Sequence, residues 1–214
     1  ITCRDWSSDV CSSDLRARLA RLVEAAMVED GARRLAFGVA EDSAMVYDRA
    51  TDAAEVVGAG GLYVVDTRNA TRDAVGGRTR IRGALLHYLT PGDRIEPGTG
   101  RIEAVGKTPI DDASRRFAVR HPLSCGVLSP YGRLAEFAGS MLMDNDAESL
   151  DLDAERGIRF ARSLLAGSLE NGAPAWEVRL GRKDGPSRAW YGSGVGFEGV
   201  VVDIIPVSME VTAL

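Results

Sequence analysis

The chain has few cysteines and few histidines. Two of its three cysteines, Cys3 and Cys11, fall within residues 1–15, so Cys125 stands alone in the remainder. A single cysteine makes no intrachain disulfide, and we expect Cys125 to be a small buried apolar residue. The two histidines, His87 and His121, are far apart in the sequence and give no spacing typical of a metal site. We therefore expect no metal and no cofactor.

The chain also lacks an excess of positive charge and any long hydrophobic run. Its formal net charge is −5 at pH 7 and its isoelectric point is about 5.2, whereas a nucleic-acid-binding protein usually carries a basic face. No apolar run reaches the ~18 residues of a membrane-spanning helix. Hydrophobic residues make up 45% of the 214 residues, which suits one domain or one and a half with a real core. We expect a cytoplasmic protein without nucleic-acid or membrane partners.

Residues 1–15 differ in character from the rest of the chain. They read ITCRDWSSDVCSSDL, contain SSD twice and show no apolar period. They resemble a translated sequencing-adapter contaminant, and we expect them to be a disordered artefact that takes no part in the fold. The alternative is a natural tail rich in serine and aspartate. There is no initiator methionine, so we expect the reading frame to begin inside a gene.

Residues 16–96 show the pattern of an α/β unit. A helix is predicted over 16–29, because apolar residues recur on one stripe at spacings of three and four. Short apolar runs bounded by Gly, Asp or Ser predict strands. The predicted strands are 35–39, which we expect to be buried on both faces, an antiparallel pair at 44–48 and 55–58, then 62–66 and 81–89. The polar segment 68–80 is predicted to be a loop, and residues 90–93 a turn.

Residues 97–214 are interpreted as an α+β extension of unknown role. The stretch 97–109 is rich in Gly and Pro and is predicted to be a linker and a candidate domain boundary. Helices are predicted over 129–143 and over 153–169, the second capped by Asp153. A hairpin that joins 176–180 to 187–191 and a central strand at 199–207 complete the prediction.

Three arginines, Arg16, Arg18 and Arg21, crowd the first two turns of the predicted helix. The amino terminus of a helix carries a partial positive charge, so this placement lowers helix stability unless an anion compensates. A ligand carboxylate is one such anion, because guanidinium groups bind carboxylates through two parallel hydrogen bonds. The alternative is a basic face exposed to solvent.

Three segments of residues 16–96 resemble the closing part of the cyanophycinase family of serine peptidases. They are AFGVAEDSAMVY, VVGAGGLYVVD and LLHYLTPGDRI, and they follow the family's order. In that family an R-x-R-x-x-R helix follows the catalytic histidine, and Arg16, Arg18 and Arg21 reproduce this spacing. The resemblance implies an α/β fold: the last helix and strands of a flavodoxin-like three-layer core, like that of class I glutamine amidotransferases, followed by the α+β extension.

The resemblance also implies an activity for the parent protein. That protein would cleave cyanophycin or a related β-aspartyl-arginine peptide by a Ser-His-Glu mechanism. Its partner is then an acidic or β-aspartyl peptide, and Arg16, Arg18 and Arg21 are its implied substrate-binding residues. No catalytic residue is assigned to this chain, because the nucleophilic serine and the glutamate would lie upstream.

The chain departs from the family pattern at several positions. Ser12 stands where the catalytic histidine is expected, and Cys11 stands where a glutamine precedes it. Ala40 replaces a usual aspartate and Ala36 a usual glycine. These departures place in doubt any catalysis by the chain as it stands.

Other motifs point less clearly to a function. Gly194-x-Gly196-x-x-Gly199 matches the dinucleotide fingerprint in letters, but a strand-like run follows it where the fingerprint needs a helix. Gly106-Lys107-Thr108 ends like a phosphate loop but has the wrong glycine spacing. The acids of 144–153 lack the glycine of a calcium loop. His87 lies in a predicted strand and is expected to be structural, and no G-x-S-x-G elbow is present.

We therefore expect a truncated cyanophycinase-like serine hydrolase that is inactive without its nucleophile. The competing interpretation is a non-catalytic peptide-binding or assembly module on the same scaffold. A third is a related exopeptidase with another acidic peptide as substrate. The sequence leaves open the true substrate and whether the protein is a homodimer.

Overall fold

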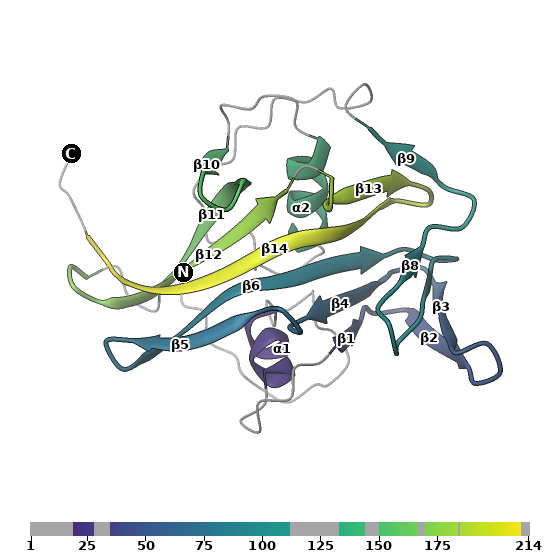
Figure 1. Cartoon of the computed structure of the whole chain (residues 1–214), viewed down its shortest axis with the longest axis horizontal. Coiled ribbons are helices and arrows are strands. Elements are labelled where there is room, and N and C mark those ends of the chain that lie inside the picture. Colours follow the sequence, from purple (N-terminus) through teal and green to yellow (C-terminus); the bar gives the residue numbers. More distant parts are fainter. Residues whose placement is uncertain are drawn as a thin grey trace.

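The computed structural model describes residues 19–27, 35–111, 133–143, 150–166, 170–183 and 185–210. These residues form a mixed fold in which sheet dominates: a ten-stranded sheet, a four-stranded sheet and two short helices (Figure 1). Arg16, Arg18, His121 and Cys125 lie outside the described residues, as does the expected artefact at 1–15.

The elements of the large sheet come from both halves of the chain. Its strands are β1 (Leu35–Val39), β4 (Leu62–Asp66), β5 (Thr71–Val75), β6 (Arg78–Leu89), β9 (Thr108–Ile110), β10 (Asp151–Asp153), β11 (Ile158–Ala166), β12 (Pro174–Arg182), β13 (Arg188–Tyr191) and β14 (Val195–Ser208). The small sheet holds β2 (Ser43–Asp48), β3 (Ala53–Gly58), β7 (Arg94–Ile95) and β8 (Ile102–Glu103). The helices are α1 (Leu19–Ala26) and α2 (Arg133–Met143).

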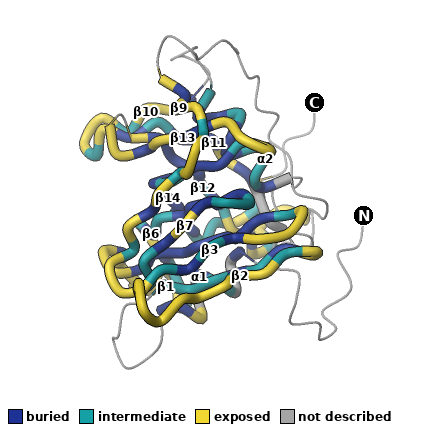
Figure 2. Tube along the Cα trace, turned by 90° about the vertical axis from the view of Figure 1, so that its right-hand side faces the viewer, coloured by how far each residue is buried: buried dark blue, intermediate teal, exposed yellow. Residues whose placement is uncertain are grey.

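The large sheet carries an apolar core on each face. All five residues of β4 are buried, and successive side chains of a strand point to opposite faces. Tyr63 and Val65 pack with the buried residues of both helices, whereas Leu62 and Val64 pack with the inward residues of the small sheet. The helices therefore cover one face and the small sheet covers part of the other. Figure 2 shows the resulting pattern, with exposed segments concentrated at the peripheral hairpins.

Most of the elements predicted for 16–96 are confirmed. The helix α1 lies within 16–29 and buries one apolar stripe, and the strands β1, β2, β3, β4 and β6 are all present. The turn at Thr90–Asp93 is closed by the Asp93 amide, which donates to the Thr90 carbonyl at 3.0 Å. In the second half, α2 lies within 129–143, and β14 is a central strand, since it pairs with both β6 and β12.

The loop predicted over 68–80 is wrong. This segment forms β5 and the start of β6, joined at Gly76 and Gly77, whose φ angles of 58° and 75° suit the two-residue turns of hairpins. Every residue of β5 is exposed. A strand with no buried face shows no apolar alternation, and its polar sequence therefore looks like a loop.

The helix predicted over 153–169 is also wrong, because the described part, 153–166, forms the end of β10, a turn and β11. Asp153 does accept a hydrogen bond from the backbone of Arg156, at 3.2 Å, but that bond closes a turn. Ile158 and Phe160 pack on one face of β11, and Ala161 packs on the other. A strand buried on both faces has apolar residues at spacings that mimic a helix.

The hairpin predicted between 176–180 and 187–191 is a third correction. β12 pairs with β11 and β14, while β13 pairs with β14 and β9. The hairpin in the structure joins β13 to β14 across a turn in which the Gly192 amide donates to the Gly194 carbonyl at 2.9 Å. Local turn residues were present in both places, and long-range pairing selected between them.

The predicted linker 97–109 contains β8 and the start of β9, and Ile102 of β8 is part of a core cluster. Furthermore, β6 from 16–96 pairs along β14 from 97–214, so both parts of the chain contribute to one sheet. The strand β1 is an edge strand and mostly half-buried, which corrects the expectation of burial on both faces. The strand pairs among the described residues are antiparallel, so the parallel core of a flavodoxin-like fold is not among them.

Candidate functional site

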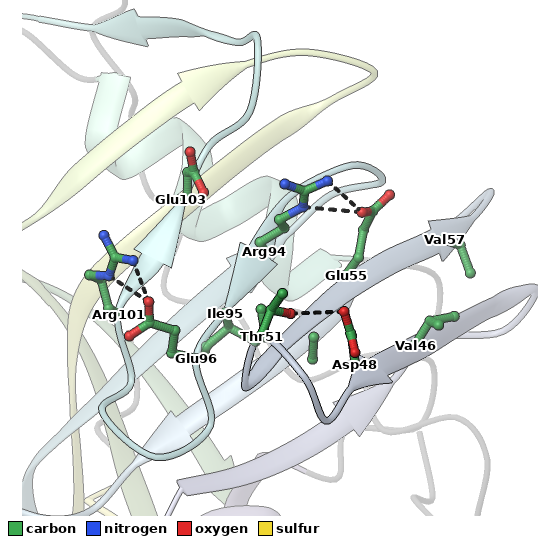
Figure 3. Close-up of a pocket in the computed structure, with 12 residues that line it drawn as sticks. Val46, Asp48, Thr51, Glu55, Val57, Arg94, Ile95, Glu96, Arg101 and Glu103 are labelled. Carbon is green, nitrogen blue, oxygen red and sulfur yellow. Dashed lines mark hydrogen bonds and ion pairs between the residues drawn. The ribbon is translucent and has the colours of Figure 1, made fainter.

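A hollow on the outer face of the small sheet has a volume of about 520 Å³ (Figure 3). Alternation along β2 and β3 places one set of side chains inward against the large sheet and the other set outward. The outward set includes Val46 and Val57, which are 54% and 37% exposed. Such a surface can hold an extended ligand along the strands.

Charged side chains of both signs line this hollow. Arg94 directs its Nε and Nη2 to one oxygen of Glu55, both at 3.1 Å, and Arg101 Nε donates to Glu96 at 2.9 Å. The hydrogen bond from Arg101, followed by that from Thr99, holds the pKa of the Glu96 carboxyl below its usual value. The lining holds four carboxylates and two guanidinium groups, which makes it acidic on balance: Asp48, Glu55, Glu96, Glu103, Arg94 and Arg101.

The turn that enters β7 holds a buried polar network. The Asp93 carboxylate accepts hydrogen bonds from the Thr90 amide at 2.8 Å and from Trp190 Nε1 at 3.0 Å. Lys107 Nζ lies 2.7 Å from the other Asp93 oxygen, and both side chains are buried. Lys107 also donates to the Thr90 hydroxyl at 2.6 Å. The network joins the turn to Trp190 of β13 and to Lys107, the residue before β9, whose partners are Asp93 and Thr90.

Close contacts and backbone conformation explain why glycine occupies positions 196 and 199, which match the dinucleotide fingerprint. A Cβ on Gly196 would lie 2.3 Å from Trp190 Nε1, so this glycine makes room for the indole that donates to Asp93. Gly199 has a φ of 76° at an irregularity in the β14–β6 register, and a Cβ there would lie 2.5 Å from the Pro186 carbonyl. Both positions lie in β14, whereas the predicted strand, 199–207, included Gly199 alone.

His87 is buried in β6, and its environment is not that of a catalytic base. Its Nδ1 accepts a hydrogen bond from the Gly199 amide at 3.3 Å, and burial lowers its pKa to about 4. The Ser187 hydroxyl donates to the Gly199 carbonyl at 2.8 Å. His87 and Ser187 therefore both support the backbone of Gly199. The expectation that His87 is structural agrees with these contacts.

Asp66, on the same face as His87, is bound by Arg68. Burial raises the pKa of this carboxyl, but hydrogen bonds from Arg68 outweigh that effect and leave the pKa lowered. Arg68 Nε lies 3.0 Å from one Asp66 oxygen, and Arg68 Nη1 donates to the Thr99 carbonyl at 2.7 Å. Asp66 ends β4, and its ion pair with Arg68 accounts for this buried carboxylate.

The predicted substrate-binding arginines are not among the described residues that line the hollow. Arg16 and Arg18 lie outside the described residues, and of Arg21 only the backbone, in α1, is described. The helix α1 packs on the face of the large sheet opposite the small sheet. The antiparallel pair β2–β3 was predicted, but the hollow was missed because β7 and β8 are two-residue strands that no local pattern predicts.

Among the described residues, no group of three or more His, Cys, Asp or Glu side chains could hold a metal ion. None of the helices in the described part of the chain is long and apolar enough to cross a membrane. No known protein family, curated protein or solved structure matches the chain.

Proposed function

We propose that this chain is the carboxyl-terminal part of a cytoplasmic, cyanophycinase-like serine hydrolase and is itself inactive. The parent protein would hydrolyse β-aspartyl-arginine peptides, with a nucleophile, base and glutamate upstream of residue 16. In this proposal, Arg16, Arg18 and Arg21 bind the substrate carboxylate, and the described strands extend a flavodoxin-like core.

The observation that carries the proposal is the spatial arrangement of the three family-like segments. AFGVAEDSAMVY spans β1 and β2, VVGAGGLYVVD spans β3 and β4, and LLHYLTPGDRI spans β6 and β7. β4 pairs with both β1 and β6, and β3 pairs with both β2 and β7. Segments separated in the sequence therefore form one contiguous unit, as the parts of a shared scaffold would.

Residues shared with the family pattern also have structural roles in this chain. A Cβ on Gly61 would lie 2.5 Å from the Leu89 carbonyl, so only glycine fits between β4 and the end of β6. Asp93 ends the T-P-G-D turn with a buried carboxylate that organises three segments. Both residues have a structural role in the scaffold, which supports the proposal that the shared letters mark a common scaffold.

The test is hydrolysis by the purified 214-residue chain. With insoluble cyanophycin as substrate, we expect no release of β-aspartyl-arginine above that of heat-denatured protein. Release that depends on native protein would contradict the proposal of an inactive fragment. The source DNA, sequenced upstream of Arg16, should encode a histidine and a serine elbow, and a frame lacking both would refute the hydrolase assignment.

The second candidate is a non-catalytic peptide-binding module, and the outer hollow favours it. Its paired arginines and carboxylates complement a zwitterionic ligand such as an arginine that keeps its own carboxylate. Calorimetric titration with the β-aspartyl-arginine dipeptide would show saturable binding that is weakened by a double substitution, Glu55→Gln with Arg94→Gln. The matched control is Asp73→Asn with Arg80→Gln, which removes an ion pair at the surface between β5 and β6. Equal binding by both double variants would exclude the hollow as the binding site of the dipeptide.

A further inference from the structure

The strand β1 differs from the other edge strands of the described sheets. Among the described strands, β1 lies at one end of the large sheet and pairs with β4 alone. Natural edge strands usually carry a charge, a proline or a bulge, or are very short, because a free edge can pair with another chain. The sequence of β1, LAFGV, has five residues with neither charge nor proline, and its register with β4 is unbroken.

Each of the other edge strands carries at least one of those protective features. At the opposite end of the large sheet, β10 has three residues, two of them aspartates. β9 contains Pro109, and β5 contains Arg72 and Asp73. In the small sheet, β8 has only two residues, and β2 ends on an aspartate. Among the described strands, β1 is the edge without such a feature.

The hydrogen-bonding register defines which backbone groups of β1 are directed outward. The Ala40 amide, just after β1, donates to the Gly61 carbonyl at 3.0 Å. Alternate residues of an antiparallel strand bond to the same neighbour, so Gly38 and Ala36 also bond to β4. The amides and carbonyls of Leu35, Phe37 and Val39 consequently point away from the sheet.

The side chains of β1 are also apolar, and most of them are half-buried. Leu35, Phe37 and Val39 pack against the cluster between the two sheets, and Ala36 packs against the cluster on the helix side. The core on both faces of the large sheet thus runs to the edge at β1 and is not closed by polar side chains. A strand added at this edge would continue both clusters.

We propose that β1 pairs antiparallel with β1 of a second copy of this chain, forming a two-fold dimer with one continuous sheet. The register centred on Phe37 sets Leu35 opposite Val39 of the second copy, and it uses all three outward-facing residues. Each such pair exchanges two backbone hydrogen bonds. The pairing is isologous and consumes both free edges, so assembly stops at the dimer. This inference is independent of the hydrolase proposal.

The test is sedimentation velocity over a range from about 1 µM to about 1 mM, because a five-residue edge forms a small and weak interface. We expect the dimer fraction of the unmodified chain to rise with concentration. A chain that stays monomeric over the whole range would overturn the proposal.

Two double variants that share one substitution test the register. In Leu35→Lys/Val39→Lys, like charges lie opposite one another across the two-fold axis, and we expect the dissociation constant to rise at least tenfold. In Leu35→Lys/Val39→Glu, opposite charges face one another, and we expect dimerisation to return. The control Val46→Lys, on the edge strand β2, should leave the dissociation constant of the dimer unchanged. Equal dissociation constants for the two double variants would overturn the β1 register.

Hydrogen exchange on the unmodified chain gives a readout that needs no variant. The Phe37 amide should exchange fast in dilute protein and become protected at high concentration, whereas the Gly38 amide, bonded within the sheet, should stay protected in both. A Phe37 amide that exchanges at the same rate at every concentration would contradict pairing through β1.

Discussion

Asp93 and Arg94 are neighbours in the sequence, but their ion pairs lie in opposite environments. Asp93 faces Lys107 between the two sheets, and their side chains are 0% and 6% exposed. Arg94 faces Glu55 on the outer surface of the small sheet, with 50% and 42% exposed. The inner pair has lost its hydration, while the outer pair keeps much of it.

The difference shows that ion pairs of similar length contribute differently to stability on the two faces of the small sheet. A buried carboxylate that loses its counter-ion has no water to replace it, and breaking such a pair is strongly destabilising. An exposed pair is screened by water and salt and contributes little. The inner face therefore determines whether the two sheets stay together, and the outer face is available for a ligand.

The largest effect is expected from Lys107→Met, which leaves the Asp93 carboxylate buried without its cation. We expect the free energy of unfolding in urea to fall by about 3–5 kcal/mol. Adding Asp93→Asn to this variant should recover part of the loss, because the buried charge is then removed. A loss below about 1 kcal/mol would mean that Thr90 and Trp190 alone satisfy Asp93, and the contrast between the faces would disappear.

The next largest effect is a dependence on pH from His87, which shares the inner face with Val64. Its pKa is about 4 in the folded chain against an ordinary value of 6.5. The unfolded chain therefore binds the proton first, and stability falls as pH drops from about 6.5 towards 4. Protonation of this group should lower the free energy of unfolding by about 1.4 kcal/mol per pH unit within that window.

The variant His87→Asn isolates this dependence, because the amide oxygen can still accept from the Gly199 amide. Urea denaturation at pH 7.5 and at pH 5 should show a smaller difference for this variant than for the unmodified chain. His121→Asn provides the control for the other histidine. An unchanged difference in His87→Asn would assign the pH effect to other groups.

A smaller difference in the free energy of unfolding is expected between substitutions of two adjacent valines of β3. Val56 is 1% exposed on the inner face, and Val57 is 37% exposed on the outer face. Val56→Ala removes two buried methyl groups and should lower the free energy of unfolding by about 1–3 kcal/mol. Val57→Ala should lower it by less than about 0.5 kcal/mol. Equal losses, measured by urea denaturation, would show that the outer face is covered in solution.

The smallest effect is expected from Arg94→Ala. Loss of an exposed pair should change the free energy of unfolding by about 0–1 kcal/mol, and less in high salt. The measurement is a pair of urea titrations at low and high salt. A loss as large as that of Lys107→Met would mean that the hollow is less hydrated than its exposed side chains indicate.

Much of the amino-terminal half was predictable because its signals are local. The stripe of α1, the apolar run of β4 and the T-P-G-D turn each contain their own pattern within a few residues. β5 and β11 were mispredicted for the opposite reason. One has no buried face and the other has two, so neither shows the alternation that identifies a strand.

The candidate site was less predictable than the fold. Sequence reasoning singled out arginines before β1, whereas the hollow is built from Glu55, Arg94 and other side chains on four strands. The spacing of these residues along the chain says nothing about their pairing. Spacing and the strand-like run had already argued against ligand-binding roles for Lys107 and the glycines of β14. The structure added their partners: Asp93 for Lys107, Trp190 for Gly196 and Pro186 for Gly199.

Composition and local pattern alone indicate a chain with a hydrophobic core and without an excess of positive charge, with short strands and a structural His87 in one of them. Those properties depend on residue type and on neighbours a few positions away. The tertiary structure decided that β6 pairs with β14, that Asp93 meets Lys107 while Arg94 meets Glu55, and that β1 ends the sheet. Such pairings join residues far apart in the chain, and they are selected by the burial of whole faces, which no local segment encodes.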